Sequence, residues 1–279
     1  MAYGAMLVLC SLKRCGKMTN RPAKLKRGQG ARPLGRVETV KHLDLSTLPK
    51  DRLERMAAAG AELENVDRAL ARTRDNVVGE ILRHQGTFFE WDHYPKGDVY
   101  DDVSHAQFFY HTHPGSARDI EHGHFHTFVR AKGMPTHVKP ARRKAMACSP
   151  CGDDALSHII GISMDPHGTP LRLFTVNRWV TGETWYNAAD VCELIDRFEV
   201  DHTQPSWATN RWITAMIQLF WPQAMALVRA RDSTIAKWQR ANPGADVLED
   251  RRLEITSQIA ISVADQVAAV RAALRTRNG

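Results

Sequence analysis

The sequence contains only five cysteines among 279 residues, and their spacing is irregular. An odd number of cysteines in a chain of this length argues against a disulfide framework and favours a reducing compartment, so we expect a cytoplasmic protein. No apolar run is long enough to span a membrane, and the short apolar run 6–12 is followed rather than preceded by basic residues, unlike a secretory signal. Glycine-rich nucleotide-binding patterns and internal repeats are also absent.

Acidic residues are missing from the first 36 positions, although nine lysines and arginines occur there. Subtracting these nine charges from the formal net charge of +7 leaves about −2 for the remainder. The basic character therefore belongs to residues 1–36, which we expect to be a disordered tail, and Met18 could start the chain as well as Met1. A folded body that is close to neutral is not expected to bind nucleic acid.

The remaining chain, 37–279, has the composition of an ordinary globular protein, with 43% hydrophobic and 25% charged residues overall. Apolar residues recur at spacings of three and four from 48 to 84 and again from 189 to 275, which is typical of amphipathic helices. Between them, residues 87–186 show short aromatic and β-branched runs separated by turn signals. We expect a single α+β domain with a central antiparallel sheet flanked by N-terminal and C-terminal helices.

Particular elements follow from the same patterns. The first helical segment, 48–84, is expected to be one long helix or a hairpin broken near Gly60. The expected strands are 87–91, 106–113, 123–130, 157–164 and 171–177, and the expected later helices are 189–198, 209–240 with an interruption at Pro222, and 247–275.

Histidines are concentrated at one place in the predicted sheet. Seven lie between His105 and His137, and two pairs repeat the spacing i, i+2, namely His111/His113 and His124/His126. Side chains two apart on a strand share a face, so two adjacent antiparallel strands could direct all four imidazoles into one volume if the register is right. Several neutral imidazoles without an ion would leave polar nitrogens in need of partners, which favours a metal site over a core packing role.

We therefore predict a mononuclear divalent transition metal held by His111, His113, His124 and His126 or a subset of them. Zinc is favoured and iron is the alternative, because imidazole suits both. Glu121 is expected in or beside the first coordination shell, and it or Glu90 is the candidate catalytic base. An open coordination position would indicate an enzyme, whereas a closed site of four ligands would indicate a binding or regulatory module.

Other residues could line a pocket beside this site. The segment 177–186 concentrates aromatic and polar groups after a predicted strand, so its candidate substrate-binding residues are Arg178, Trp179, Trp185 and Tyr186. The pair Cys148 and Cys151 has the C-x-x-C spacing but stands alone, and free thiols are the simpler interpretation. The C-terminal helices could support a homo-oligomer, and the substrate, a small molecule or a peptide, is not specified by these residues.

The segments Tyr-His-x-His (110–113), Glu-His-Gly-His-Phe-His (121–126) and Asn-Arg-Trp-Val-Thr-Gly-Glu-Thr-Trp (177–185) resemble those of a bacterial family of unknown function. That resemblance covers about a third of the chain and implies no activity.

Three functional families show partial similarity. Residues 110–114 resemble the H-[ST]-H-P strand end of JAMM metalloisopeptidases, but Glu121 and His124 stand where that family has a serine and an aspartate. His111, His113 and Glu121 resemble the metal ligands of cupins, with a longer gap before the glutamate. Residues 122–128 resemble the alternating pattern of histidine triad hydrolases. We expect a metal-dependent hydrolase, with a metal-stabilised module or a cupin-like iron oxygenase as alternatives.

Overall fold

A seven-stranded sheet forms the centre of the computed structural model, with the strand order β1-β7-β6-β5-β4-β3-β2. All pairings are antiparallel except that of the two-residue β1 with β7. The strands are β1 (Glu38–Thr39), β2 (Tyr94–Tyr100), β3 (Ala106–His111), β4 (Gly123–Arg130), β5 (Leu156–Met164), β6 (Pro170–Val176) and β7 (Ile255–Ala260). The expected central antiparallel sheet is confirmed.

Helices come before and after the strands of the sheet in the chain. They are α1 (Lys50–Ala71), α2 (Val77–Leu82), α3 (Arg178–Thr181), α4 (Ala188–Ile195), α5 (Trp207–Leu219), α6 (Trp221–Ala241) and α7 (Val263–Asn278), with short 3₁₀ turns η1 (Leu45–Thr47), η2 (Ala131–Gly133), η3 (Gly152–Asp154) and η4 (Val247–Glu249). The structure describes residues 38–39, 43–113, 120–141, 150 and 152–278, so the predicted tail lies outside it. All described residues fall within one compact unit, Leu34–Gly279.

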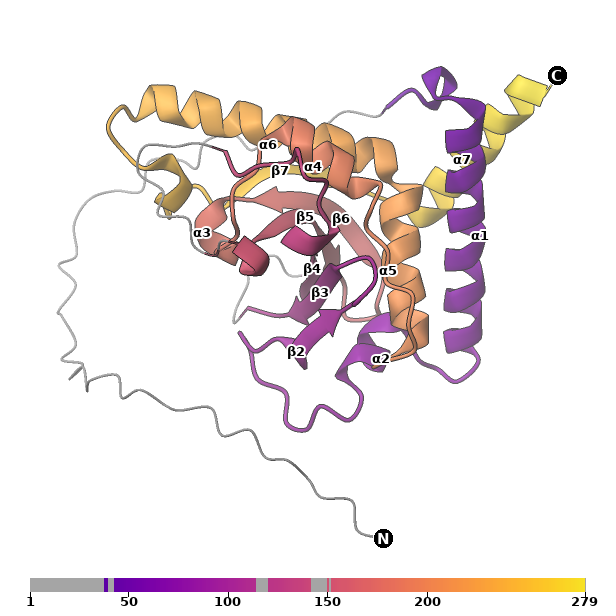
Figure 1. Cartoon of the computed structure of the whole chain (residues 1–279). Coiled ribbons are helices and arrows are strands. Elements are labelled where there is room, and N and C mark those ends of the chain that lie inside the picture. Colours follow the sequence, from indigo (N-terminus) through magenta and orange to yellow (C-terminus); the bar gives the residue numbers. More distant parts are fainter. Residues whose placement is uncertain (1–37, 40–42, 114–119, 142–149, 151, 279) are drawn as a thin grey trace, which may run out of the picture. The chain divides into compact units, whose positions relative to one another are not determined.

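Most of the helices pack against one face of the sheet, whereas Val180 of α3 packs with Phe174, a neighbour of His124 on the other face. Helix α6 contacts β5, β6 and β7, α4 contacts β5, and α1 packs on α5 and α7 (Figure 1). The largest apolar cluster joins these helices to alternate residues of the central strands, among them Phe108, Tyr110, Phe125 and Val129. Residues between them in sequence point to the opposite face, because side chains alternate along a strand. The histidines belong to that second face.

The helical hairpin at the N-terminus breaks later than Gly60. That glycine lies inside α1, where a side chain would come within 2.8 Å of Val267 of α7. The chain leaves the helix after Ala71 and re-enters it at α2, where the Asn76 side chain accepts hydrogen bonds from the backbone N–H groups of Val78 and Gly79. An asparagine that caps free N–H groups in this way is a helix start signal.

Two expected elements are wrong. Residues 87–91 form no strand; the edge strand β2 instead begins at Tyr94 and includes the Tyr94-Pro95-Lys96-Gly97 sequence that predicts a turn. An edge strand tolerates proline because one side of it needs no ladder hydrogen bonds, and the pairing with β3 is irregular between Tyr94 and Val99.

The second error is the helix expected over 247–275. Its first part contains η4 and β7, and only α7 is helical. Ile255 and Ile259 are four residues apart, as on one face of a helix, but tertiary contacts decide otherwise, since Ser257 of β7 donates a hydrogen bond to the Leu227 carbonyl of α6 at 2.8 Å. The strand is also paired with β6 along its length.

Candidate metal centre

The register between β3 and β4 places histidines opposite one another. His111 pairs with His124, and Phe109 pairs with His126. Gly123 permits this close approach, because a Cβ at that position would lie 2.6 Å from the His111 carbonyl oxygen. The predicted convergence of imidazoles from two adjacent strands is therefore present.

Three histidines come together closely enough to share one ion. One ring nitrogen from each of His111, His113 and His124 lies within 4.8 Å of the other two, and Nε2 of His111 is 2.7 Å from Nε2 of His124. His111 and His124 are buried, whereas His113 is half-buried and marks the open side of the cluster. We call these residues the three-histidine cluster.

His111 is held in its neutral form. Burial lowers the pKa of His111 to about 2, and the neighbouring His124, His113 and His93 rings add to this effect. A neutral imidazole keeps a lone pair available, which is the form that binds metals. A donor set of three imidazole nitrogens fits zinc or another divalent transition metal.

Glu121 lies behind His124 rather than between the histidines. Its Oε1 is 2.9 Å from Nδ1 of His124, and its Oε2 accepts a hydrogen bond from Ser163 Oγ at 2.7 Å and pairs with Arg172. Burial opposes ionisation, but the bonds from His124 and Ser163 and the charge of Arg172 outweigh it and lower the pKa of Glu121 to about 2. The carboxylate therefore orients the His124 ring with its Nε2 toward His111, the usual arrangement around metal-ligating histidines.

His126 stands outside the three-histidine cluster. Its Nδ1 is 2.9 Å from Nε2 of His158 on β5, and both side chains are fully buried. Burial lowers the pKa of His126 well below its ordinary value and that of His158 to about 3. His158 was missed in the sequence because a lone histidine carries no spacing signal, and only the pairing of β4 with β5 brings it to this face.

The chain before β2 borders the cluster. Trp91 meets His113 edge to face with ring centroids 4.2 Å apart, and His93 stacks on Phe109 at 3.5 Å. His93 Nδ1 lies 3.0 Å from Asp98 Oδ1. Glu90, a predicted catalytic residue, is exposed beside Trp91. The segment thus contributes rings to the site, and a catalytic role for Glu90 stays a prediction.

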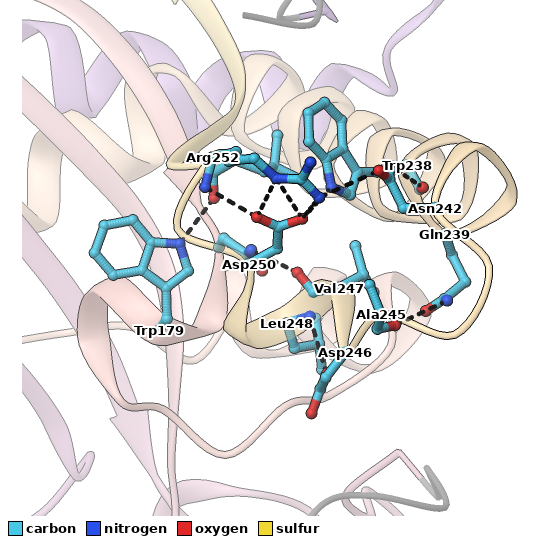
Figure 2. A network of polar contacts seen from close by, with 12 residues as sticks. Trp179, Trp238, Gln239, Asn242, Ala245, Asp246, Val247, Leu248, Asp250 and Arg252 are labelled. Atoms are coloured by element: carbon cyan, nitrogen blue, oxygen red, sulfur yellow. Dashed lines mark hydrogen bonds and ion pairs between the residues drawn. The ribbon is translucent and has the colours of Figure 1, made fainter. Parts of the chain in front are cut away.

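The predicted substrate-binding residues lie around α3 and the chain that follows it. Arg178 pairs with Glu249, and Trp179 donates a hydrogen bond to the Leu253 carbonyl at 2.8 Å. Figure 2 shows the Trp179 indole against the turn that contains Asp250 and Arg252. In that turn the Asp250 carboxylate pairs with Arg252 and its Oδ2 accepts a hydrogen bond from Trp238 Nε1 at 2.9 Å.

The other two residues of this prediction, Trp185 and Tyr186, are buried. Trp185 is fully enclosed beneath the guanidinium of Arg231, whose Cζ lies 4.1 Å from the ring centroid, as in a cation–π contact. Tyr186 is 2% exposed in the main core. Burial of this kind favours a packing role, and a role in substrate binding stays a prediction. Cys148 and Cys151 lie outside the described residues.

Comparisons with known proteins agree with the sequence segments noted above. Residues 57–261 match a family described as a domain of unknown function, DUF6969. The chain belongs to this family. No curated protein and no solved structure matches it, so the weaker similarities to JAMM metalloisopeptidases, cupins and histidine triad hydrolases have no support beyond the residues that suggested them. Within the described residues of this DUF6969 protein, no helix has the length and apolar character needed to cross a bilayer.

Proposed function

We propose that this DUF6969 protein binds one divalent transition metal through His111, His113 and His124 and is a metal-dependent hydrolase. The observation that carries the proposal is the approach of three ring nitrogens to within 4.8 Å of one another. Three protein ligands leave a coordination position for water or substrate, as in catalytic zinc sites, whereas structural zinc sites are closed by four. A metal in such a site polarises a substrate oxygen and activates water.

Glu121 is a positioning residue in this proposal. Its oxygens are engaged by His124, Ser163 and Arg172, and its pKa of about 2 makes it a weak proton acceptor at neutral pH. Its carboxylate fixes the ring of His124 and raises the basicity of that ligand. The sequence prediction of Glu121 as catalytic base is less well supported than this role.

The rival function is a metal-stabilised binding or regulatory module, which needs a fourth protein ligand. His126 is the nearest candidate, with its ring centroid 4.9 Å from that of His124. His126 is not among the histidines whose ring nitrogens come within 4.8 Å of one another, and this supports the open site. Zinc remains favoured over iron. A cytoplasmic location and a homo-oligomer formed through the C-terminal helices remain part of the proposal.

Elemental analysis of protein purified without a histidine tag tests the site. We expect about one equivalent of a transition metal in the wild type, as the three-ligand site requires, and well under one in His111→Ala, His113→Ala and His124→Ala. His137→Ala is the matched control, because His137 is exposed and paired with Glu193. A wild type without stoichiometric metal would overturn the proposal.

Two further measurements separate the enzyme from the module. X-ray absorption at the bound metal should show three imidazoles and a light oxygen ligand; four imidazoles would favour the module. Hydrolysis of a panel of p-nitrophenyl esters and phosphates should be lost on chelation and recovered when the metal is restored.

A further inference from the structure

Large apolar side chains are exposed beside the three-histidine cluster. Phe88, Phe89 and Trp91 are 40%, 58% and 61% exposed. We call these three residues the aromatic lip. Several large apolar side chains exposed in one short segment of a folded protein often mark a binding site.

The backbone under the aromatic lip is anchored. The Tyr94 hydroxyl accepts a hydrogen bond from the Phe89 N–H at 2.6 Å and donates one to the Phe89 carbonyl at 3.2 Å. The Trp91 N–H donates to the Thr112 carbonyl at 3.0 Å. The aromatic rings are therefore exposed on a fixed support, and their exposure does not result from a loose loop.

Trp91 also adopts a left-handed backbone conformation, with φ at +72°. This conformation is strained for a bulky residue and is tolerated where the surroundings impose it, commonly at functional sites. It sets the indole edge to face with His113, the half-buried member of the three-histidine cluster. A molecule resting on the aromatic lip would therefore lie next to the open side of that cluster.

Two carboxylates alternate with the rings of the aromatic lip. Glu90 and Asp92 are exposed, and among the described residues neither has a cationic partner or a side-chain hydrogen bond. Aromatic faces attract cations through their quadrupole, and carboxylates add a longer-range attraction. This surface therefore complements an apolar group that carries a positive charge.

We infer that the aromatic lip binds a substituted ammonium group of the molecule on which the three-histidine site acts. The inference rests on the proposed function, because it concerns the substrate of that site. An anionic group would be repelled by Glu90 and Asp92, and an uncharged apolar group would use the rings but leave both carboxylates without a partner.

Choline and its uncharged isostere 3,3-dimethylbutan-1-ol are the probes. Binding to the full chain is measured by ligand-observed NMR at fixed ionic strength. Choline should bind at least tenfold more tightly than the isostere, and Trp91→Ala should weaken choline binding at least tenfold. The double variant Glu90→Gln/Asp92→Asn should reduce the preference for choline severalfold. Trp207→Ala removes a tryptophan of similar exposure, 53%, on α5 and should leave binding unchanged.

The outcome is read together with the metal content of the same samples. Equal affinity for the two probes, or choline binding that Trp91→Ala does not weaken, would overturn the inference. If the same samples contain bound metal, that result leaves the proposed function standing. Absence of metal from the wild type would instead count against the proposed function. The link between the two is tested by cobalt-substituted protein, whose visible absorption should change on addition of choline in the wild type and not in Trp91→Ala.

Discussion

Replacement of Glu121 by glutamine tests whether the three-histidine cluster is prepared for a metal. The carboxylate accepts from His124 and Ser163 and pairs with Arg172, so both of its oxygens serve as acceptors. A glutamine of the same shape keeps one acceptor oxygen, but an NH₂ group replaces the other oxygen. This NH₂ group is a donor, and it would lie against either the guanidinium of Arg172 or the imidazole N–H of His124, which are donors too. One of these contacts must therefore be lost in Glu121→Gln.

Loss of such an outer carboxylate typically lowers metal affinity about 10- to 100-fold, which corresponds to about 1.4 to 2.7 kcal/mol. We expect this decrease for zinc, measured at pH 7.5 by competition with a chromophoric chelator. Ser163→Ala removes one hydrogen bond and keeps the charge, so its affinity should fall less. Equal zinc affinities of Glu121→Gln and the wild type would refute the orienting role of Glu121.

Three more predictions concern stability. Burial raises the pKa of Glu183 from 4.5 to about 7 against the opposing charge of Arg231, so the contribution of its protonated form to the free energy of unfolding is full below pH 4.5 and is lost as pH rises through 7. Urea unfolding should show that the free energy of unfolding decreases by about 3 kcal/mol over that range, and Glu183→Gln should abolish this decrease. Gly123→Ala should destabilise the fold by about 1 to 3 kcal/mol, measured the same way, because its Cβ would collide with the His111 carbonyl. The double variant His111→Leu/His124→Leu should raise the melting temperature of the metal-free protein, and zinc should no longer change that temperature. A zinc-induced increase in melting temperature that persists in this variant would contradict the assigned ligands.

Much of the histidine-bearing face could be predicted because it depends on local patterns. Alternation alone places His124 and His126 on one side of β4, whose predicted bounds are those observed. It also places His111 on the matching side of β3, which ends at His111, so His113 lies two residues beyond the strand rather than inside it as predicted. The register that brings His111 opposite His124 depends on how β3 pairs with β4, the next strand in the chain. Local periodicity is a strong signal, so the shared face was accessible from the sequence, whereas the register across the connection 112–122 was a condition that only the structure met.

Other parts depended on partners far away in the sequence. Residues 255–260 have apolar spacing that suits a helix, and only pairing with β6 and packing on α6 make them a strand. The role of Glu121 depends on Ser163 and Arg172, which reach it from β5 and β6. His158 likewise reaches His126 through the sheet. Tertiary contacts of this kind override local propensity and are not encoded in any short segment.

The energetics of the metal-free cluster favour a functional reason for it. His111 and His124 place two buried nitrogens 2.7 Å apart, where only one of the two can donate. Burying polar rings costs free energy even when one donates to the other, and apolar side chains of the same volume would avoid that cost. Glu121, Ser163 and Arg172 nevertheless fix the His124 ring in place, which further restricts its freedom to find other partners. A bound ion would satisfy the lone pairs of all three histidines at once without moving the strands. The arrangement is therefore unfavourable in free energy without a metal and favourable with one.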